Sequence, residues 1–171
     1  MSDSNSDSGS RPSAGASRDE SWRGKVGGLE RQEFEAFLGE GHIARLACLD
    51  DDEWPYVVPC WHEWDGDGFW VIPREKSAWA RYLQREPRCA ITVDESSALR
   101  KVIAQCEAEL VEEPNVGGRW VPIAERMSLR YLGENGPKYL EPTLDKHRWL
   151  FYLRPARLWT WQGVDWAKRY K

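Results

Sequence analysis

The stretch HIARLACLDDDEWPYVVPCWHEWDGDGFWVIP, residues 42–73, decides the fold of this chain. It holds three apolar runs, which are separated by the acidic turn Asp50–Glu53 and by two Asp-Gly steps at Asp65–Gly68. Apolar runs divided by such turn residues are typical of consecutive β-hairpins. We therefore expect a meander of three strands, at His42–Leu49, Pro55–Trp64 and Phe69–Pro73.

Both faces of these expected strands are largely apolar, as the runs at 57–58 and 70–72 show. A sheet with one face in water would instead alternate apolar and polar residues along each strand. Continuous apolar runs favour a closed barrel whose outside is also covered. We therefore expect another surface to pack on the outer face of the barrel.

Apolar spacing beyond this stretch predicts three helices and three more strands. The helices end near a glycine or a proline, and alternation is cleanest from Val102 to Leu110. This order predicts a mainly β domain with flanking helices. The expected helices are Glu30–Gly39, Ala78–Leu83 and Arg119–Leu132; the expected strands are Arg88–Asp94, Arg100–Glu112 and Arg148–Trp161, the last broken at Pro155 and preceded by an irregular segment, Asn135–His147.

The first twenty residues, MSDSNSDSGSRPSAGASRDE, are rich in Ser, Asp and Gly and have almost nothing to bury. Such a segment cannot offset the entropy of ordering itself. We expect a disordered tail over residues 1–22 and one cofactor-binding domain over residues 23–171. The chain shows neither the apolar centre of a signal peptide nor a run long enough to cross a bilayer, so we expect a cytoplasmic protein without membrane contact.

The charge and the cysteines exclude several classes of function. The formal net charge is −4, and the tail accounts for half of it, which leaves −2 on the folded part. Nucleic-acid binding normally requires a basic stripe, so we do not expect this protein to bind nucleic acid. The four cysteines are widely spaced and the three histidines are isolated. This pattern indicates buried free thiols and no metal site.

The sequence Arg74-Glu75-Lys76-Ser77 lies where a strand is expected to end and a helix to begin. A helix N-terminus presents free backbone N–H groups and a partial positive charge. Two cations and a hydroxyl at that point would form a cradle for phosphate. Solvated loop charges and a serine that only caps the helix are the alternative interpretation of these residues.

A flat ligand is suggested by proline and tryptophan near this cradle. Pro59 interrupts an apolar strand and cannot donate to a ladder, so the edge of a ligand could lie beside it. Trp61 follows Pro59 and Trp79 follows the basic loop, in a chain that has eleven Trp. Either indole could flank a planar ring, and core packing is the alternative role of each.

The order of segments resembles the split-barrel flavin-binding family, which includes pyridoxamine phosphate oxidases and deazaflavin-dependent reductases. The resemblance runs from about Leu29 to Tyr170. It is carried by the order and spacing of four stretches: HIARLACLDDDEWPYVVPCWHEWDGDGFWVIP, REKSAWARYLQREPRCAITVDE, VIAQCEAELVEEP and FYLRPARLWTWQGVDWAKRY.

The resemblance implies a six-stranded antiparallel split β-barrel that forms a homodimer, with FMN in the clefts between subunits. It implies that basic and hydroxyl residues after the third strand hold the phosphate and that the ring lies along the second strand. The matching residues are Arg74, Lys76, Ser77 and Arg81 for the phosphate; Val58, Pro59, Cys60, Trp61, Ile72 and Pro73 for the ring; Gln105 as a further contact; and Trp159 and Trp161 toward the partner's cofactor.

Two departures from the family pattern bear on phosphate and substrate. Many relatives carry a second basic residue where this chain has Trp79, so its phosphate-binding set is thinner. Pyridoxamine phosphate oxidases end in a segment with Arg and His for the substrate phosphate, which TWQGVDWAKRY does not match. We therefore do not expect pyridoxamine phosphate as the substrate.

The resemblance implies an FMN-dependent oxidoreductase that passes hydride between a nicotinamide donor such as NAD(P)H, the flavin and a small organic acceptor or oxygen. The cofactor would carry the chemistry, so no catalytic residue is assigned. One alternative is the deazaflavin coenzyme, whose polyanionic tail could use Arg45, Arg81, Arg85 and Arg88. Others are a non-catalytic flavin- or haem-binding module and an oligonucleotide-binding barrel, the latter opposed by the weak negative charge.

Overall fold

The structure, a computed structural model, describes residues 25–164, so the predicted disordered tail lies outside it. None of the helices in this range is long and apolar enough to cross a membrane. In chain order the elements are α1 (Arg31–Leu38), β1 (Ala44–Leu49), β2 (Pro55–Cys60), β3 (Glu63–Trp64), β4 (Phe69–Val71), α2 (Ala78–Arg85), β5 (Arg88–Asp94), β6 (Lys101–Asn115), α3 (Trp120–Leu132), the 3-10 turn Gly133–Asn135, α4 (Gly136–Leu140), the 3-10 turn Glu141–Thr143 and β7 (Arg148–Trp161).

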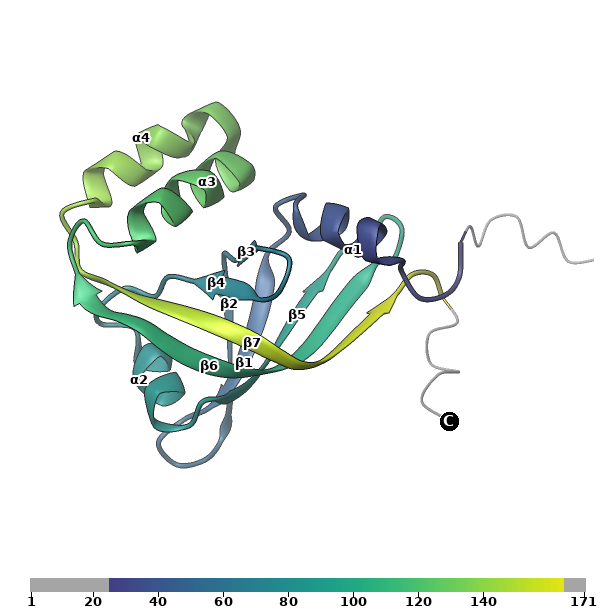
Figure 1. Cartoon of the computed structure of the whole chain (residues 1–171), viewed down its shortest axis with the longest axis horizontal. Coiled ribbons are helices and arrows are strands. Elements are labelled where there is room, and N and C mark those ends of the chain that lie inside the picture. Colours follow the sequence, from purple (N-terminus) through teal and green to yellow (C-terminus); the bar gives the residue numbers. More distant parts are fainter. Residues whose placement is uncertain (1–24, 165–171) are drawn as a thin grey trace, which may run out of the picture.

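One antiparallel sheet runs through the domain in the order β2-β1-β5-β6-β7-β4-β3. The long strands β6 and β7 curve across it, with α1 at one end, α2 on one side and the α3–α4 pair on the other (Figure 1). The predicted mainly β fold with flanking helices, an antiparallel split barrel, is confirmed. The described sheet has seven strands rather than six.

The extra strand arises because the expected strand Pro55–Trp64 is interrupted at His62. The His62 backbone N–H donates to the Tyr131 hydroxyl over 3.2 Å, and the His62 carbonyl accepts a bond from Arg130 Nη1 over 2.9 Å. Side chains of α3 thus form hydrogen bonds with the backbone N–H and carbonyl groups that a continuous β-strand would use for pairing. The expectation of one strand was wrong for this long-range reason.

The last strand is continuous, contrary to the predicted break at Pro155. Gln105 pairs with Arg157 while Cys106 pairs with Pro155, so Ala156 is an extra residue in β7. This is a β-bulge, in which a residue without an N–H is tolerated. The proline therefore bends the pairing of β6 and β7 without ending it.

The segment predicted to be irregular, 135–147, instead contains α4 and a 3-10 turn. Gly136 allows α4 to approach α3, because a Cβ at this position would lie 2.5 Å from the backbone of Ser128. The α3–α4 pair encloses a second apolar core beside the barrel core. Its buried members are Trp120, Ile123, Ala124, Met127, Leu140 and Leu150.

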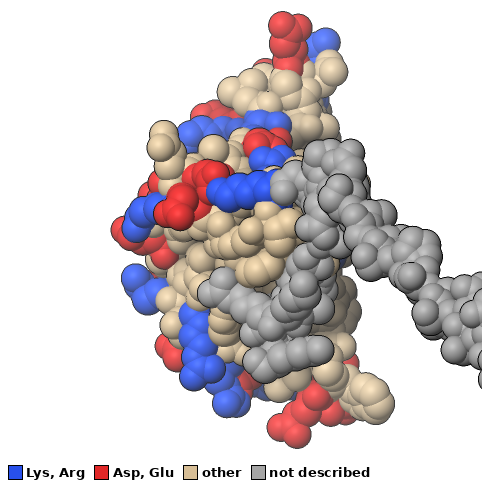
Figure 2. Space-filling view, turned by 90° about the vertical axis from the view of Figure 1, so that its right-hand side faces the viewer, with Lys and Arg blue, Asp and Glu red and all other residues tan. Residues whose placement is uncertain are grey.

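The surface carries both signs of charge. On the face shown in Figure 2, basic and acidic side chains both occur across the described part. Several are joined in ion pairs, such as Arg100 with Glu40 at 2.6 Å and Arg45 with Asp94 at 2.5 Å. Exposed pairs of this kind contribute little to stability, but they occupy cations that a polyanion would need.

Candidate functional site

A cavity of about 430 Å³ lies where the end of β2, the loop after β4 and the helices α3 and α4 meet. Small-molecule sites typically occupy roughly 300–1,000 Å³. The cavity is lined by Ile43, Pro59, Cys60, Trp61, Ile72, Pro73, Arg74, Ser77, Trp79, Ala124, Met127, Tyr139, Leu140 and Arg148.

The structure brings together most of the predicted site residues in this cavity. They come from three separated parts of the chain: the end of β2, the residues after β4 and the start of α2. Those that line the cavity are Pro59, Cys60, Trp61, Ile72, Pro73, Arg74, Ser77 and Trp79.

The other predicted residues lie elsewhere. Val58 packs against the barrel core, and Lys76 and Arg81 are exposed and do not line the cavity. Gln105 lines a separate hollow with Ala90 and Arg157. Trp159 and Trp161 lie on β7 and do not line the cavity. Their predicted cofactor contacts stay predictions.

One end of the cavity is cationic, because Arg74 and Arg148 both line it and meet in an isolated β-bridge. Ser77 stands immediately before α2, yet its hydroxyl makes no bond that caps the helix. Ser77 is thus the N-cap residue of α2 by position, but its side chain does not cap the helix. The backbone N–H of Ser77 donates to the Arg74 carbonyl over 2.9 Å, which orders the loop at this end.

Six lining residues were not predicted from the sequence, and Arg148 is the charged one; the others are Ile43, Ala124, Met127, Tyr139 and Leu140. The Arg148 side chain is only 8% exposed, and its Nε is buried without a hydrogen-bond partner among the described residues. Nη2 donates to the Thr143 hydroxyl over 2.8 Å, and the guanidinium lies 5.4 Å from the centre of the Trp120 ring. Burial, followed by the nearby Arg74 charge, lowers the pKa of Arg148. Nothing in the local sequence marks an arginine at the start of a strand as a cavity residue.

Aromatic rings form another wall of the cavity. The Trp61 indole stacks on the Tyr131 ring, with centroids 4.8 Å apart and planes inclined by 2°. Tyr139, which is 45% exposed, lies 5.3 Å from Trp61 at an angle of 50°. Offset and tilted pairs of this kind are favourable arrangements of aromatic rings. The wall therefore presents flat apolar surfaces to a ligand.

A buried histidine contacts Tyr131, the ring on which Trp61 stacks, and supports this aromatic wall. His62 is fully buried, and its Nδ1 lies 2.9 Å from the Tyr131 hydroxyl, which also donates to the His42 carbonyl over 3.0 Å. Burial, aided by the Arg130 charge, lowers the pKa of His62 to about 3. Burial raises the pKa of Tyr131 to about 12. Both side chains are therefore neutral at neutral pH and act as a structural support.

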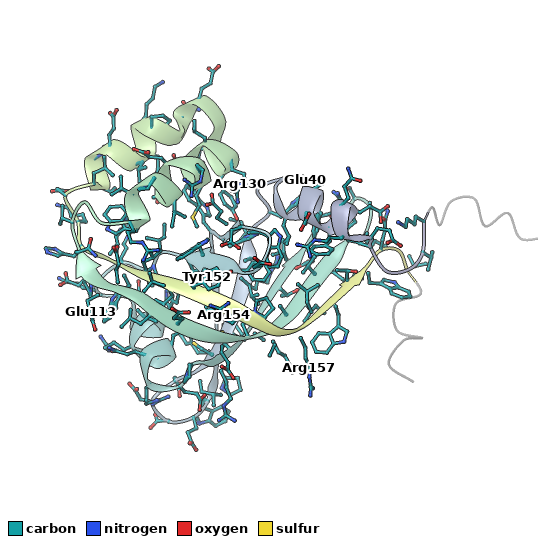
Figure 3. The ribbon with its side chains drawn as sticks, in the orientation of Figure 1. Glu40, Glu113, Arg130, Tyr152, Arg154 and Arg157 are labelled. Atoms are coloured by element: carbon teal, nitrogen blue, oxygen red, sulfur yellow. The ribbon has the colours of Figure 1, made fainter. Side chains whose placement is uncertain are left out.

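A carboxylate anchors α3 to the chain between β2 and β4. Glu63 is buried, and its two oxygens accept bonds from Arg126 at 2.6 Å and Arg130 at 3.0 Å. Arg130 projects from α3 toward this region in Figure 3. Because α3 also carries Met127, a lining residue, this ion-pair cluster helps to define the shape of the cavity.

The thiol in the cavity is not poised for nucleophilic chemistry. Burial raises the pKa of Cys60 to about 12, so it is protonated at neutral pH. The four cysteines are free, in agreement with the predicted thiols. Between residues 25 and 164, no three His, Cys, Asp or Glu side chains gather as metal ligands.

The outer face of the sheet is continuous with the cavity. Residues directly opposite each other in antiparallel strands share a face, and one such row joins Pro59, Arg45, Thr92, Ile103 and Trp159. Pro59 also lines the cavity.

A neighbouring row of the same face joins Val57, Ala47, Ala90, Gln105 and Arg157. Arg157 points away from the sheet in Figure 3. The face thus presents small and apolar residues beside the site, together with polar side chains such as Arg45, Gln105 and Arg157.

The fold and the cavity define a split-barrel domain with a small-molecule cleft at the edge of the barrel. The family model for pyridoxamine 5'-phosphate oxidase matches residues 31–162, and the chain belongs to this family. No curated protein sequence matches the chain.

Solved structures show the same fold. A conserved hypothetical protein of Mycobacterium tuberculosis has a TM-score of 0.64 at 20% identity, over 82% of this chain and 88% of the other. HutZ, the haem storage protein of Vibrio cholerae, has a TM-score of 0.58 at 23% identity, over 76% and 93%. An F420 reductase has a TM-score of 0.56 at 21% identity, over 72% and 94%.

Proposed function

We propose that this chain is an FMN-dependent oxidoreductase that acts on a small organic substrate. The proposal is carried by one observation: residues from three separated segments, each matched to cofactor binding on sequence grounds, line a single cavity of about 430 Å³. The flavin ring would lie along Pro59–Trp61, with Ile72 and Pro73 beside it. The phosphate would lie at the end formed by Arg74 and Ser77.

The chemistry of the lining residues fits this cofactor. Apolar and aromatic groups form most of the wall, which suits an isoalloxazine ring. Within the described part of the chain, the charged lining residues are Arg74 and Arg148, and no acidic residue lines the cavity. Cations gathered at one end, with a hydroxyl at Ser77, match a phosphate at one end of a flat apolar molecule.

When bound, FMN supplies hydride transfer at its ring, so the chain needs no acid–base pair of its own. The side chains bind and orient the ring, and the α3–α4 pair shields it from water. Met127, Tyr139 and Leu140 line the helical side of the cavity and would contact an organic substrate there. NAD(P)H is the proposed hydride donor.

The deazaflavin coenzyme fits less well. The candidates for its anionic tail were Arg45, Arg81, Arg85 and Arg88, and none of the four lines the cavity. Arg45, Arg85 and Arg88 pair with Asp94, Asp51 and Glu86, respectively, whereas Arg81 is exposed. A longer polyanionic tail would therefore have to leave the cavity, and three of these arginines would have to give up an existing ion pair to bind it.

We further propose that the chain works as a homodimer in the cytoplasm, with the outer sheet face as its interface. This face carries Ile103 and Trp159 and reaches the cavity at Pro59. A second copy placed there could bring its own Trp159 or Trp161 toward the bound flavin. Ile103→Glu would put a charge in the middle of this face, and light scattering should then report monomers where the wild type forms dimers. A wild-type monomer at micromolar concentration would contradict the interface.

The test of the binding site is a titration of the apoprotein with FMN, in which the quenching of flavin fluorescence reports binding. Arg74→Ala should weaken FMN binding by about 1.5–3 kcal/mol, the contribution of a hydrogen bond to a charged group. Arg154→Ala is the matched control, because Arg154 is exposed and pairs with Glu109 outside the cavity. Equal FMN affinity in wild type and Arg74→Ala would remove the proposed phosphate position.

A further inference from the structure

The environment of Arg148 is unfavourable for a cation in the ligand-free protein. Its side chain is more than nine-tenths buried, and its Nε has no acceptor among the described residues. A buried charge that lacks both a partner and water costs considerable free energy. Nothing in the fold requires arginine at the first position of β7, so this cost calls for a compensating role.

The groups around Arg148 do not neutralise it. Its contacts are the Thr143 hydroxyl, at 2.8 Å, and the face of the Trp120 ring, at 5.4 Å. Among the described residues Arg148 forms no ion pair with a carboxylate, and the charge of Arg74 further disfavours the protonated guanidinium. Two cations therefore share one end of a cavity that no acidic residue between 25 and 164 lines. An anion from outside the chain is the missing partner.

We propose that Arg148 and Arg74 form a clamp for the terminal phosphomonoester of the bound ligand and so select FMN over riboflavin. The identification of the ligand as a flavin rests on the proposed function, whereas the anion site rests on the two guanidiniums.

The selection follows from charge. A phosphomonoester carries between one and two negative charges near neutral pH, since its second pKa is about 6, and so approaches the charge of two guanidiniums. Riboflavin has no phosphate and would leave the buried cation uncompensated. Trp120, which is fully buried, and Thr143 contact Arg148 and hold its guanidinium in place.

The experiment compares the binding of FMN and of riboflavin to wild type, Arg148→Met and the exposed control Arg154→Met. In Arg148→Met, FMN affinity should fall by about tenfold to a hundredfold, the loss expected for a charge-assisted hydrogen bond. Riboflavin affinity should change by less than about twofold, since riboflavin has no phosphate to lose a contact with. Arg154→Met should retain the wild-type preference for FMN.

A second readout separates ligand binding from a structural role. Because an unpaired buried charge is removed, ligand-free Arg148→Met should melt at or above the wild-type temperature. Inorganic phosphate should raise the melting temperature of wild type and not of the variant. A variant that melts lower than wild type and keeps its preference for FMN over riboflavin would assign Arg148 a purely structural role and overturn the clamp.

The two proposals fail in different ways. If wild type binds neither flavin, the proposed function fails, and stabilisation by phosphate that depends on Arg148 still supports the anion site for another phosphomonoester. If wild type binds FMN and riboflavin equally well, the flavin site stands and the clamp is refuted. Stabilisation by phosphate that persists in Arg148→Met also refutes it.

Discussion

Mild acid should destabilise this protein through one side chain, His62. Burial lowers the pKa of this histidine from 6.5 to about 3. The unfolded chain therefore takes up a proton as the pH falls below 6.5, whereas the folded chain does not until the pH is near 3. Stability that is fully present above pH 6.5 is lost as the pH falls, by about 1.4 kcal/mol per pH unit.

Between pH 7 and pH 5 this linkage amounts to about 2 kcal/mol. The window isolates His62, because the carboxylates with lowered pKa values, such as Glu86 and Glu95, titrate from an ordinary value of 4.5 and contribute at lower pH. Urea denaturation of the apoprotein at the two pH values measures the difference directly. With an m-value typical of a small protein, the midpoint should fall by roughly 1 M.

The matched variants are His62→Gln and His147→Gln. Glutamine at position 62 cannot take up the proton, so the unfolding free energy of this variant should be almost independent of pH between 7 and 5. His147 is exposed, and His147→Gln should keep the wild-type decrease. A wild-type protein equally stable at both pH values, or an undiminished decrease in His62→Gln, would refute the buried neutral histidine and the support it gives to Tyr131.

Two further predictions concern the groups around the cavity. Glu63→Gln should lower the unfolding free energy, measured by urea denaturation, by about 2–4 kcal/mol, because it removes the charge of a buried carboxylate that binds two arginines. The exposed control Glu109→Gln should lower it by less than about 1 kcal/mol. Equal effects of the two substitutions would contradict the anchoring of α3. Cys60, with its pKa raised to about 12, should resist iodoacetamide in the folded apoprotein at pH 8 and react after unfolding. Rapid alkylation of Cys60 in the folded state, seen by peptide mass mapping, would show that the cavity wall is open.

Local patterns were sufficient to predict α1, α2, α3 and most strands, but not α4. The strand Arg88–Asp94 and the helix over 120–132 match the prediction within one residue, because their apolar spacing agrees with their tertiary contacts. The break at His62 was not predictable, because it depends on Arg130 and Tyr131 nearly seventy residues later in the chain. The bulge at Pro155 was interpreted as a break for a similar reason: pairing, not propensity, decides its outcome.

The candidate site divides in the same way. The sheet side of the cavity, from Pro59 to Trp79, could be predicted because proline, basic residues and a helix start mark part of it and the resemblance to the split-barrel family supplied the rest, such as Ile72 and Pro73. The helical side could not, since Met127 looks like an ordinary helix residue and Tyr139 lies in a segment predicted to be irregular. Arg148 has no sequence signal at all; the burial of its unpaired Nε is visible only in three dimensions.

The most direct test of the central claim is to identify what the purified protein holds. The protein is purified without added cofactor, its visible absorbance spectrum is recorded, and the molecule released on denaturation is identified by mass. The account predicts the two absorbance bands of a flavin and released FMN. A single deazaflavin band or a Soret band would contradict FMN as the cofactor, and a colourless protein that does not bind added FMN would contradict the proposed function altogether.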